Sequence, residues 1–152
     1  MPQHKYKVSV HARFGVIWQK LLDKIEHPQK YVIEIRHVEI LERKPDHIVR
    51  RVQFENTSWQ ELKELIIINE KAGTIVYRLV DHPYFTGDTT NICRTTNDAH
   101  ISELEYTIDW KLKDPNGIES TEIKDDARQA LELSAREMKR ASEEAESVHG
   151  KL

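Results

Sequence analysis

The last quarter of the chain, from about residue 123 to residue 148, carries apolar and small side chains at a helical spacing. At 3.6 residues per turn these positions fall within one narrow arc, and charged residues fill most of the remaining surface. The pattern predicts one long amphipathic helix. Its inner arc consists of Ile123, Ala127, Ala130, Leu131, Ser134, Met138, Ala141, Ala145 and Val148.

Small side chains predominate on this predicted arc. A helix that only seals a core usually presents Leu, Ile or Phe, because larger side chains bury more apolar area. We therefore expect either a close neighbour or an empty space against this helix.

A strand and a helix are predicted at the start of the chain. Residues 5–10 alternate between polar and apolar side chains, which indicates a half-buried strand. Large apolar residues follow at helical spacing over residues 14–25. Pro28 ends this helix, because proline lacks the amide hydrogen and disfavours helix in the residue before it.

Strand patterns then continue as far as residue 113. The last strand alternates most clearly between apolar and polar residues, which is typical of an antiparallel sheet covered on one face. A strand, a helix, six antiparallel strands and a long helix predict an α+β fold, with one domain over residues 1–152. The six strands are predicted at residues 33–43, 47–54, 59–69, 74–82, 89–95 and 100–113, with the least regular connection at residues 81–87.

An arginine and a glutamate are predicted to meet on the inner face of the sheet. If Val52 faces the interior, Arg50 on the same strand faces it too, and turn-centred pairing with the next strand places Glu64 opposite Arg50. A buried arginine needs a partner. The pair could anchor the polar end of a ligand or relay charge, and the alternative is a purely structural ion pair.

The register of the strand at residues 74–82 depends on the length of the turn before it. A two-residue turn directs Val76, Arg78 and Val80 inward, whereas a four-residue turn directs Tyr77 inward with its apolar neighbours. The higher apolar content of the second set favours the longer turn.

Three aromatic residues are candidates for a cavity wall. Tyr77 would join Tyr106 and Trp110, which lie on the apolar face of the last strand. Each offers a large apolar surface together with one hydroxyl or indole hydrogen-bond donor. The alternative is that all three only pack the core.

Composition excludes several classes of partner. The chain has 152 residues, of which 32% are charged, and a formal net charge of −3. Mixed charge gives no broad basic surface for a nucleic-acid backbone, so nucleic acid is not an expected partner. No run resembles a membrane span or a signal peptide, and we expect a soluble, cytoplasmic protein.

Eight histidines raise the question of a metal site. None forms a His-x-x-x-His pair, and hairpin pairing separates His37 from His47, so neither a metal nor another cofactor is expected. The single Cys93 excludes an internal disulfide and has no neighbouring base, which favours a small core residue over a nucleophile. The hydroxyl of Ser134 either bonds back to its own helix or contacts a ligand.

Two short segments carry a resemblance to known proteins. Residues 16–22 read VIWQKLL and residues 27–31 read HPQKY. With the order of elements, they resemble the START/polyketide-cyclase superfamily, also called SRPBCC, helix-grip or birch-pollen-allergen-like, and most closely its AtaL-like family. The resemblance implies a curved, seven-stranded antiparallel sheet wrapped around the C-terminal helix. It also implies a cavity between them that often holds a hydrophobic small molecule.

Binding of a small hydrophobic or aromatic ligand, by a monomer or a homodimer, is the function that this resemblance favours. The alternative is an enzyme of cyclase, aromatase or lyase type, in which Arg50, Glu64 and a tyrosine polarise a carbonyl and move a proton. A protein interaction module is a third hypothesis, which predicts a large exposed apolar patch. The predicted ligand-binding residues are Arg50, Val52, Glu64, Tyr77, Tyr106, Ile108, Trp110, Ala130, Ser134 and Met138.

Overall fold

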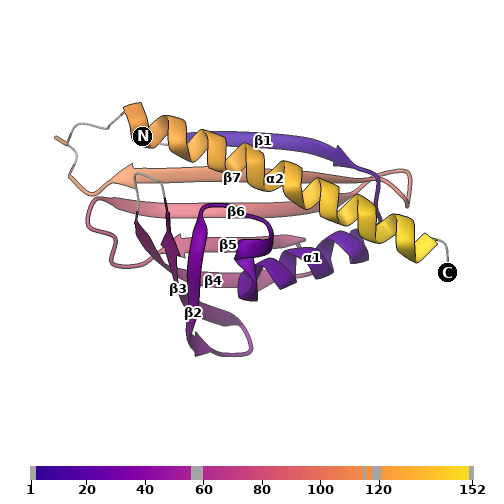
Figure 1. Ribbon diagram of the computed structural model, residues 1–152, viewed down its shortest axis with the longest axis horizontal. Coiled ribbons are helices and arrows are strands. Elements are labelled where there is room, and N and C mark those ends of the chain that lie inside the picture. The colour runs from indigo at the N-terminus through magenta and orange to yellow at the C-terminus, as the bar shows by residue number, and fades with distance from the viewer. Residues whose placement is uncertain (1–2, 56–59, 115, 118–120, 151–152) are drawn as a thin grey trace.

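The computed structural model describes residues 3–55, 60–114, 116–117 and 121–150, the side chains of residues 121–123 and 149–150 excepted. The described residues form one seven-stranded antiparallel sheet with the strand order β1-β7-β6-β5-β4-β3-β2 (Figure 1). In chain order the elements are β1 (Gln3–Val10), α1 (Phe14–Glu26), the 3₁₀ turn η1 (Pro28–Lys30), β2 (Ile35–Arg43), β3 (His47–Phe54), β4 (Glu61–Asn69), β5 (Thr74–Leu79), β6 (Phe85–Thr95), β7 (Ser102–Leu112) and α2 (Thr121–Gly150).

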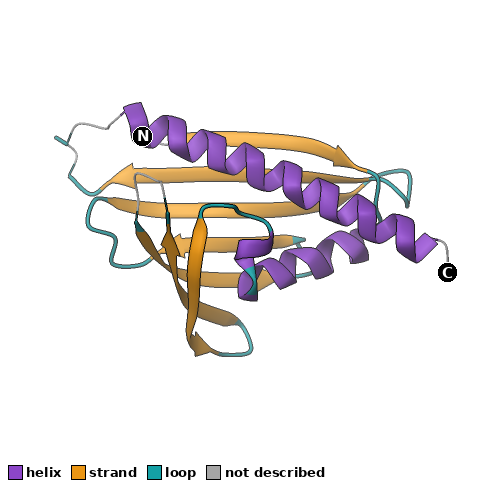
Figure 2. Ribbon diagram, viewed as in Figure 1, coloured by secondary structure: helices purple, strands orange, loops and turns teal. Residues whose placement is uncertain are grey.

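Both helices lie on the same face of the sheet, and α2 runs obliquely across it (Figure 2). α2 packs against β1, β7 and α1, and α1 packs against β6. β2 and β3 turn steeply away from the other strands, so the sheet curves around the helices (Figure 1). This arrangement confirms the predicted α+β helix-grip fold, with a helix after the first strand and a long helix at the C-terminal end.

The strand registers follow the turn-centred pairing predicted from the sequence. Glu39 lies opposite Arg51 on the outer face of the β2–β3 hairpin. Arg50 lies opposite Glu64 across β3 and β4, and both side chains are buried. An opposite-charge pair on each face therefore supports the same register.

The longer of the two turns precedes β5. Asn69 pairs with Thr74 across residues 70–73, and Tyr77 is consequently buried with a relative exposure of 3%. Arg78 points to the outer face, where its guanidinium pairs with Asp88. The four-residue turn is confirmed.

α2 confirms the predicted long helix and corrects the arc that it buries. Val148, predicted to face inward, is 61% exposed, because the last turns of α2 run past the edge of the sheet (Figure 1). Ala130, Ala141 and Ala145 are half-buried, and the side chain of Ile123 lies outside the described residues. Among the α2 side chains that the structure describes, the buried ones are Ala127, Leu131, Ser134, Ala135, Met138 and Ser142.

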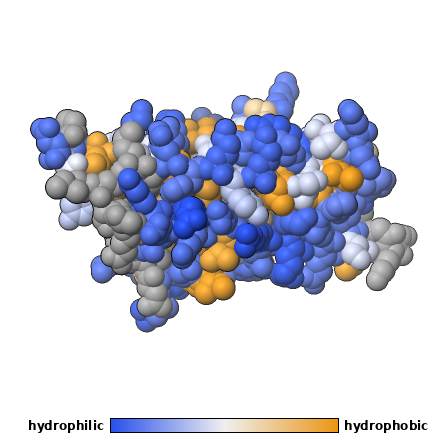
Figure 3. Space-filling model, turned by 90° about the horizontal axis from the view of Figure 1, so that it is seen from above, coloured by the Kyte–Doolittle hydropathy of each residue, from blue (hydrophilic) through white to orange (hydrophobic). Residues whose placement is uncertain are grey.

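The outer surface is mostly hydrophilic where it is seen from above, with hydrophobic side chains in small separate groups (Figure 3). Charged residues of α2 are exposed as well, among them Arg140, which pairs with Glu137 and Glu144. Among the described residues, no helix combines the length and the apolar composition that crossing a membrane requires.

β6 begins at Phe85, earlier than the predicted residue 89, because a glycine lets it approach β7 closely. Gly87 has φ +130° and lies opposite Trp110. A Cβ atom at this position would lie 2.1 Å from the carbonyl oxygen of Asp109. Only glycine therefore allows β6 to continue at this position, where the strand pairs with β7 next to Trp110 of the inner face.

Replacing Gly87 by alanine tests this close approach. We expect Gly87→Ala to lower the free energy of unfolding by about 1–3 kcal/mol, because the new methyl group clashes with the β7 backbone. Gly15→Ala is the matched control, because a Cβ at Gly15 meets no atom within 4 Å. Urea unfolding followed by circular dichroism measures both, and equal stability of the two variants would contradict the assignment.

Candidate functional site

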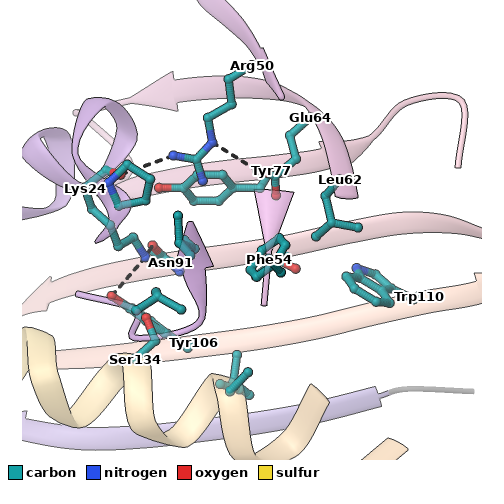
Figure 4. A pocket seen from close by; sticks show the side chains of 16 residues that line it. Lys24, Arg50, Phe54, Leu62, Glu64, Tyr77, Asn91, Tyr106, Trp110 and Ser134 are labelled. Carbon is teal, nitrogen blue, oxygen red and sulfur yellow. Dashed lines mark hydrogen bonds and ion pairs between the residues drawn. The ribbon is translucent and has the colours of Figure 1, made fainter. Parts of the chain in front are cut away.

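A cavity of about 110 Å³ lies between the inner face of the sheet and α2, beside the last turn of α1. Its wall is chemically divided. In Figure 4, Lys24, Asn91 and Tyr106 gather on one side, and Leu62 and Trp110 lie on the other. The cavity therefore has a polar end and an apolar end.

Most of the predicted ligand-binding residues surround this cavity. Val52, Ile108 and Met138 do not, because their side chains are buried in the surrounding core. Those that line the cavity are Arg50, Glu64, Tyr77, Tyr106, Trp110, Ala130 and Ser134.

The sequence predictions missed three polar residues of the cavity, Thr89 on β6 and the two residues of its polar end, Lys24 and Asn91. Lys24 lies on α1 at helical spacing from the buried Ile17 and Leu21, so its position on the inner arc was available from the periodicity. Asn91 pairs with Tyr106 across β6 and β7, so the inward direction of Tyr106 implied that of Asn91. Both signals were hidden by polar residue types that usually face solvent.

Arg50 connects two strands to the end of a helix. Its Nε donates a hydrogen bond to Glu64 Oε1 at 3.0 Å. Its Nη1 donates to the backbone carbonyls of Lys24 at 3.2 Å and Ile25 at 2.7 Å, near the end of α1. Terminal carbonyls carry the negative end of the helix dipole, so the guanidinium satisfies and stabilises them.

Lys24 is buried at the polar end of the cavity, with a relative exposure of 6%. Its Nζ donates hydrogen bonds to Asn91 Oδ1 and to Tyr106 Oη, the latter at 3.1 Å. Burial, and after it the nearby charge of Arg50, lower the pKa of this amine from its ordinary value to about 7, although the charge of Glu64 partly opposes both. A substantial neutral fraction is therefore present at neutral pH.

The two tyrosines next to Lys24 remain protonated at neutral pH. Burial raises the pKa of Tyr77 and of Tyr106, and a hydrogen bond with Ser134 only partly opposes this for Tyr106. Ser134 is thus part of the cavity wall, where its side chain bonds to Tyr106. The buried Tyr77 Oη has no hydrogen-bond partner among the described residues. It is consequently a donor available to a bound molecule.

Other nucleophiles and metal ligands give no comparable site. Cys93 is a buried member of the core on β6, and burial raises the pKa of its thiol to about 12, which agrees with a small core residue. Within the described part of the chain, no group of three or more His, Cys, Asp or Glu side chains could hold a metal ion.

Removing one member of the buried ion pair tests its role in the fold. We expect Arg50→Met and Glu64→Leu each to cost about 3–5 kcal/mol of unfolding free energy, and the double variant to cost less than their sum, because each single change strands a buried charge. The exposed pair Arg51–Glu61, with 3.2 Å between Nε and Oε1, is the matched control and should contribute about 0–1 kcal/mol. Urea unfolding gives both cycles, and additivity at Arg50 and Glu64 would contradict the coupling.

The pH dependence of stability tests the burial of Lys24. The pKa of Lys24 is about 7 in the folded protein against an ordinary value of 10.5, so between these pH values the unfolded chain binds more protons. The contribution of Lys24 to the free energy of unfolding therefore rises with pH, by roughly 1–3 kcal/mol between pH 7 and 9. Unfolding of wild type and Lys24→Met at both pH values isolates this term. Lys20→Met, one turn earlier, should leave the wild-type pH dependence unchanged.

Comparison with known proteins gives a family and a set of similar folds. The family described as acetylaranotin biosynthesis cluster protein L, AtaL, matches residues 15–146. No match was found among curated protein sequences. The Zhui aromatase/cyclase from Streptomyces sp. R1128 is 19% identical with a TM-score of 0.66, over 98% of this chain and 93% of that one.

Two further solved structures have similar folds. TTHA0849 from Thermus thermophilus is 12% identical with a TM-score of 0.76, over 95% of this chain and 99% of that one. A START superfamily protein from Mycobacterium smegmatis is 19% identical with a TM-score of 0.69, over 94% and 98%. At these identities the structures show a shared fold. Because the family match extends from the first turn of α1 to the last turns of α2, the chain belongs to the AtaL family.

Proposed function

We propose that this protein binds a small hydrophobic or aromatic molecule that carries one polar oxygen function. The observation that carries the proposal is the divided cavity, which has an apolar wall at one end and buried hydrogen-bond donors at the other. Tyr77 Oη, without a partner among the described residues, supplies a donor that a ligand oxygen would satisfy.

The size of the cavity limits the ligand. Its volume of about 110 Å³ is below the roughly 150 Å³ of a cavity that accommodates benzene. A second, outer pocket of about 490 Å³ lies between residues 29–34 and α2, and shares Val32, Ala130 and Ser134 with the first. We infer that a single ring fits with small adjustments, and that a larger ligand would extend through these shared residues into the outer pocket.

An enzymatic role is the second candidate, and the position of Lys24 favours it. Arg50 is engaged by Glu64 and by the end of α1, so these two residues are poorly placed to act on a substrate. Lys24 and Tyr106 instead present an amine and a phenol to the same cavity, 3.1 Å apart. A proton transfer at a substrate carbonyl would use this pair.

An interaction module receives less support from the surface. The face seen in Figure 3 shows hydrophobic side chains in small separate groups, whereas a docking surface would require a larger contiguous patch.

Filling the cavity tests the proposed binding. Benzyl alcohol, titrated into the protein and followed by Trp fluorescence and NMR shift changes, should bind the wild type. Ala130→Phe should weaken this binding at least about tenfold, because the ring occupies the space shared by the two pockets.

The matched control adds the same ring to the solvent face of α2. Gln129→Phe lies next to Ala130 in sequence on an exposed position, and should bind like the wild type. Wild-type affinity in a folded Ala130→Phe variant would exclude this cavity. If Ala130→Phe lost about 1–3 kcal/mol of stability and wild-type protein bound no benzyl alcohol, the core would simply be tightly packed.

A further inference from the structure

Lys24 occupies an environment that disfavours a protonated amine. Its side chain is buried, and its Nζ contacts two neutral acceptors, Asn91 Oδ1 and Tyr106 Oη. Among the described residues no carboxylate forms an ion pair with it, since Glu64 is bound by Arg50. A lysine that served only to stabilise the fold would be expected at the surface or paired with a carboxylate.

The groups that face Lys24 explain why the neutral amine is present. Arg50 adds a like charge, Glu64 an opposite one, and the rings of Tyr77 and Tyr106 lie 5.3 Å and 4.3 Å from Nζ. With a pKa of about 7, about half of the Lys24 amines are neutral at pH 7. An ordinary lysine is neutral in only on the order of one molecule in 10³ at this pH. The neutral amine is the nucleophilic form.

We propose that Lys24 is a covalent attachment site for a small aldehyde or ketone, which it holds as a Schiff base inside the cavity. This inference rests on the proposed function, because the cavity must admit a small hydrophobic molecule. The lone pair of Nζ attacks the carbonyl carbon, and a proton moves to the carbonyl oxygen to give a carbinolamine. Loss of water then leaves a C=N bond, so that amine and carbonyl are converted to imine and water, with no oxidant or reductant required.

Two phenols are positioned for the proton transfers that this reaction needs. Tyr106 Oη lies 3.1 Å from Nζ. After Nζ has attacked the carbonyl carbon, the oxygen of the resulting carbinolamine is therefore within reach of this phenol. Tyr106 can donate its proton to the departing hydroxyl and accept one from nitrogen. Tyr77, whose Oη has no partner among the described residues, can donate a hydrogen bond to the carbonyl oxygen.

The charge balance favours a carbonyl compound over an anion. The positive charge of Arg50 is matched by Glu64, with 3.0 Å between Nε and Oε1. The remaining cation, Lys24, is neutral for much of the time at pH 7. A carboxylate ligand would therefore enter a buried site that offers it little net positive charge.

Reductive trapping tests the proposal on the intact protein. Benzaldehyde and sodium cyanoborohydride are added at pH 7, and peptide mapping by mass spectrometry locates the benzylated amine. We expect Lys24 to be labelled at least about tenfold faster than any other lysine, because of its larger neutral fraction.

Two variants and two further ligands make each outcome decisive. Lys24→Met should lose the fast label and Lys20→Met should retain it, and circular dichroism checks that both variants fold. If a variant does not fold, peptide mapping of the wild type alone still shows whether Lys24 is the labelled residue. If benzyl alcohol binds but Lys24 is not labelled preferentially, the covalent proposal is wrong and the proposed function stands. If neither compound binds, both fail. Tight binding of benzoate without trapping of benzaldehyde would identify an anion site instead and overturn the proposal.

Discussion

Arg50 donates from Nη1 to the carbonyls at the end of α1 and from Nε to Glu64, so that one buried guanidinium joins β3, β4 and the first helix. A guanidinium has its donors in a fixed planar arrangement, and therefore fixes the angle between these elements as well as their distance. The last turn of α1 is held over the inner face of the sheet as a result. That turn carries Lys24, so the position of the amine in the cavity depends on the contacts of Arg50.

The same guanidinium also shapes the electrostatics of the cavity. Glu64 is required as the partner of a buried arginine, and once it is bound by Arg50 it is no longer a direct partner for Lys24. Lys24 then faces the like charge of Arg50 and two neutral acceptors, and burial lowers the pKa of its amine to about 7. Lys24 is therefore easily deprotonated, first because it is itself buried and second because the positive charge of Arg50 lies nearby. Stability and chemical reactivity are linked at this end of the cavity.

Much of the fold could be predicted from the sequence, because strand registers depend on turn length and on a period of two. Arg50 opposite Glu64 and the inward direction of Tyr77 both follow from these local rules. The inward direction of Lys24 was harder to predict, since a lysine on a helix usually faces solvent. Only the tertiary structure shows that α1 ends over the inner face of the sheet. Val148 was wrongly expected inside for a related reason: helical periodicity gives the inner arc of α2 but not where the sheet beneath it ends.

The small side chains of α2 have two causes, and both of the alternatives raised by the sequence apply at different positions. Ala127 and Ala135 are fully buried, where α2 is covered by its packing neighbours, and larger residues would be excluded there. Ala130 and Ser134 instead border the cavity, so their small size leaves room for it. Residues three and four positions apart share one face of a helix. Along that face, some turns can therefore pack against their neighbours while other turns border the cavity, and the backbone stays regular. The cavity therefore depends on the small residues Ala130 and Ser134 at particular turns of α2. The buried alanines Ala127 and Ala135 set the distance between this helix and the elements it packs against.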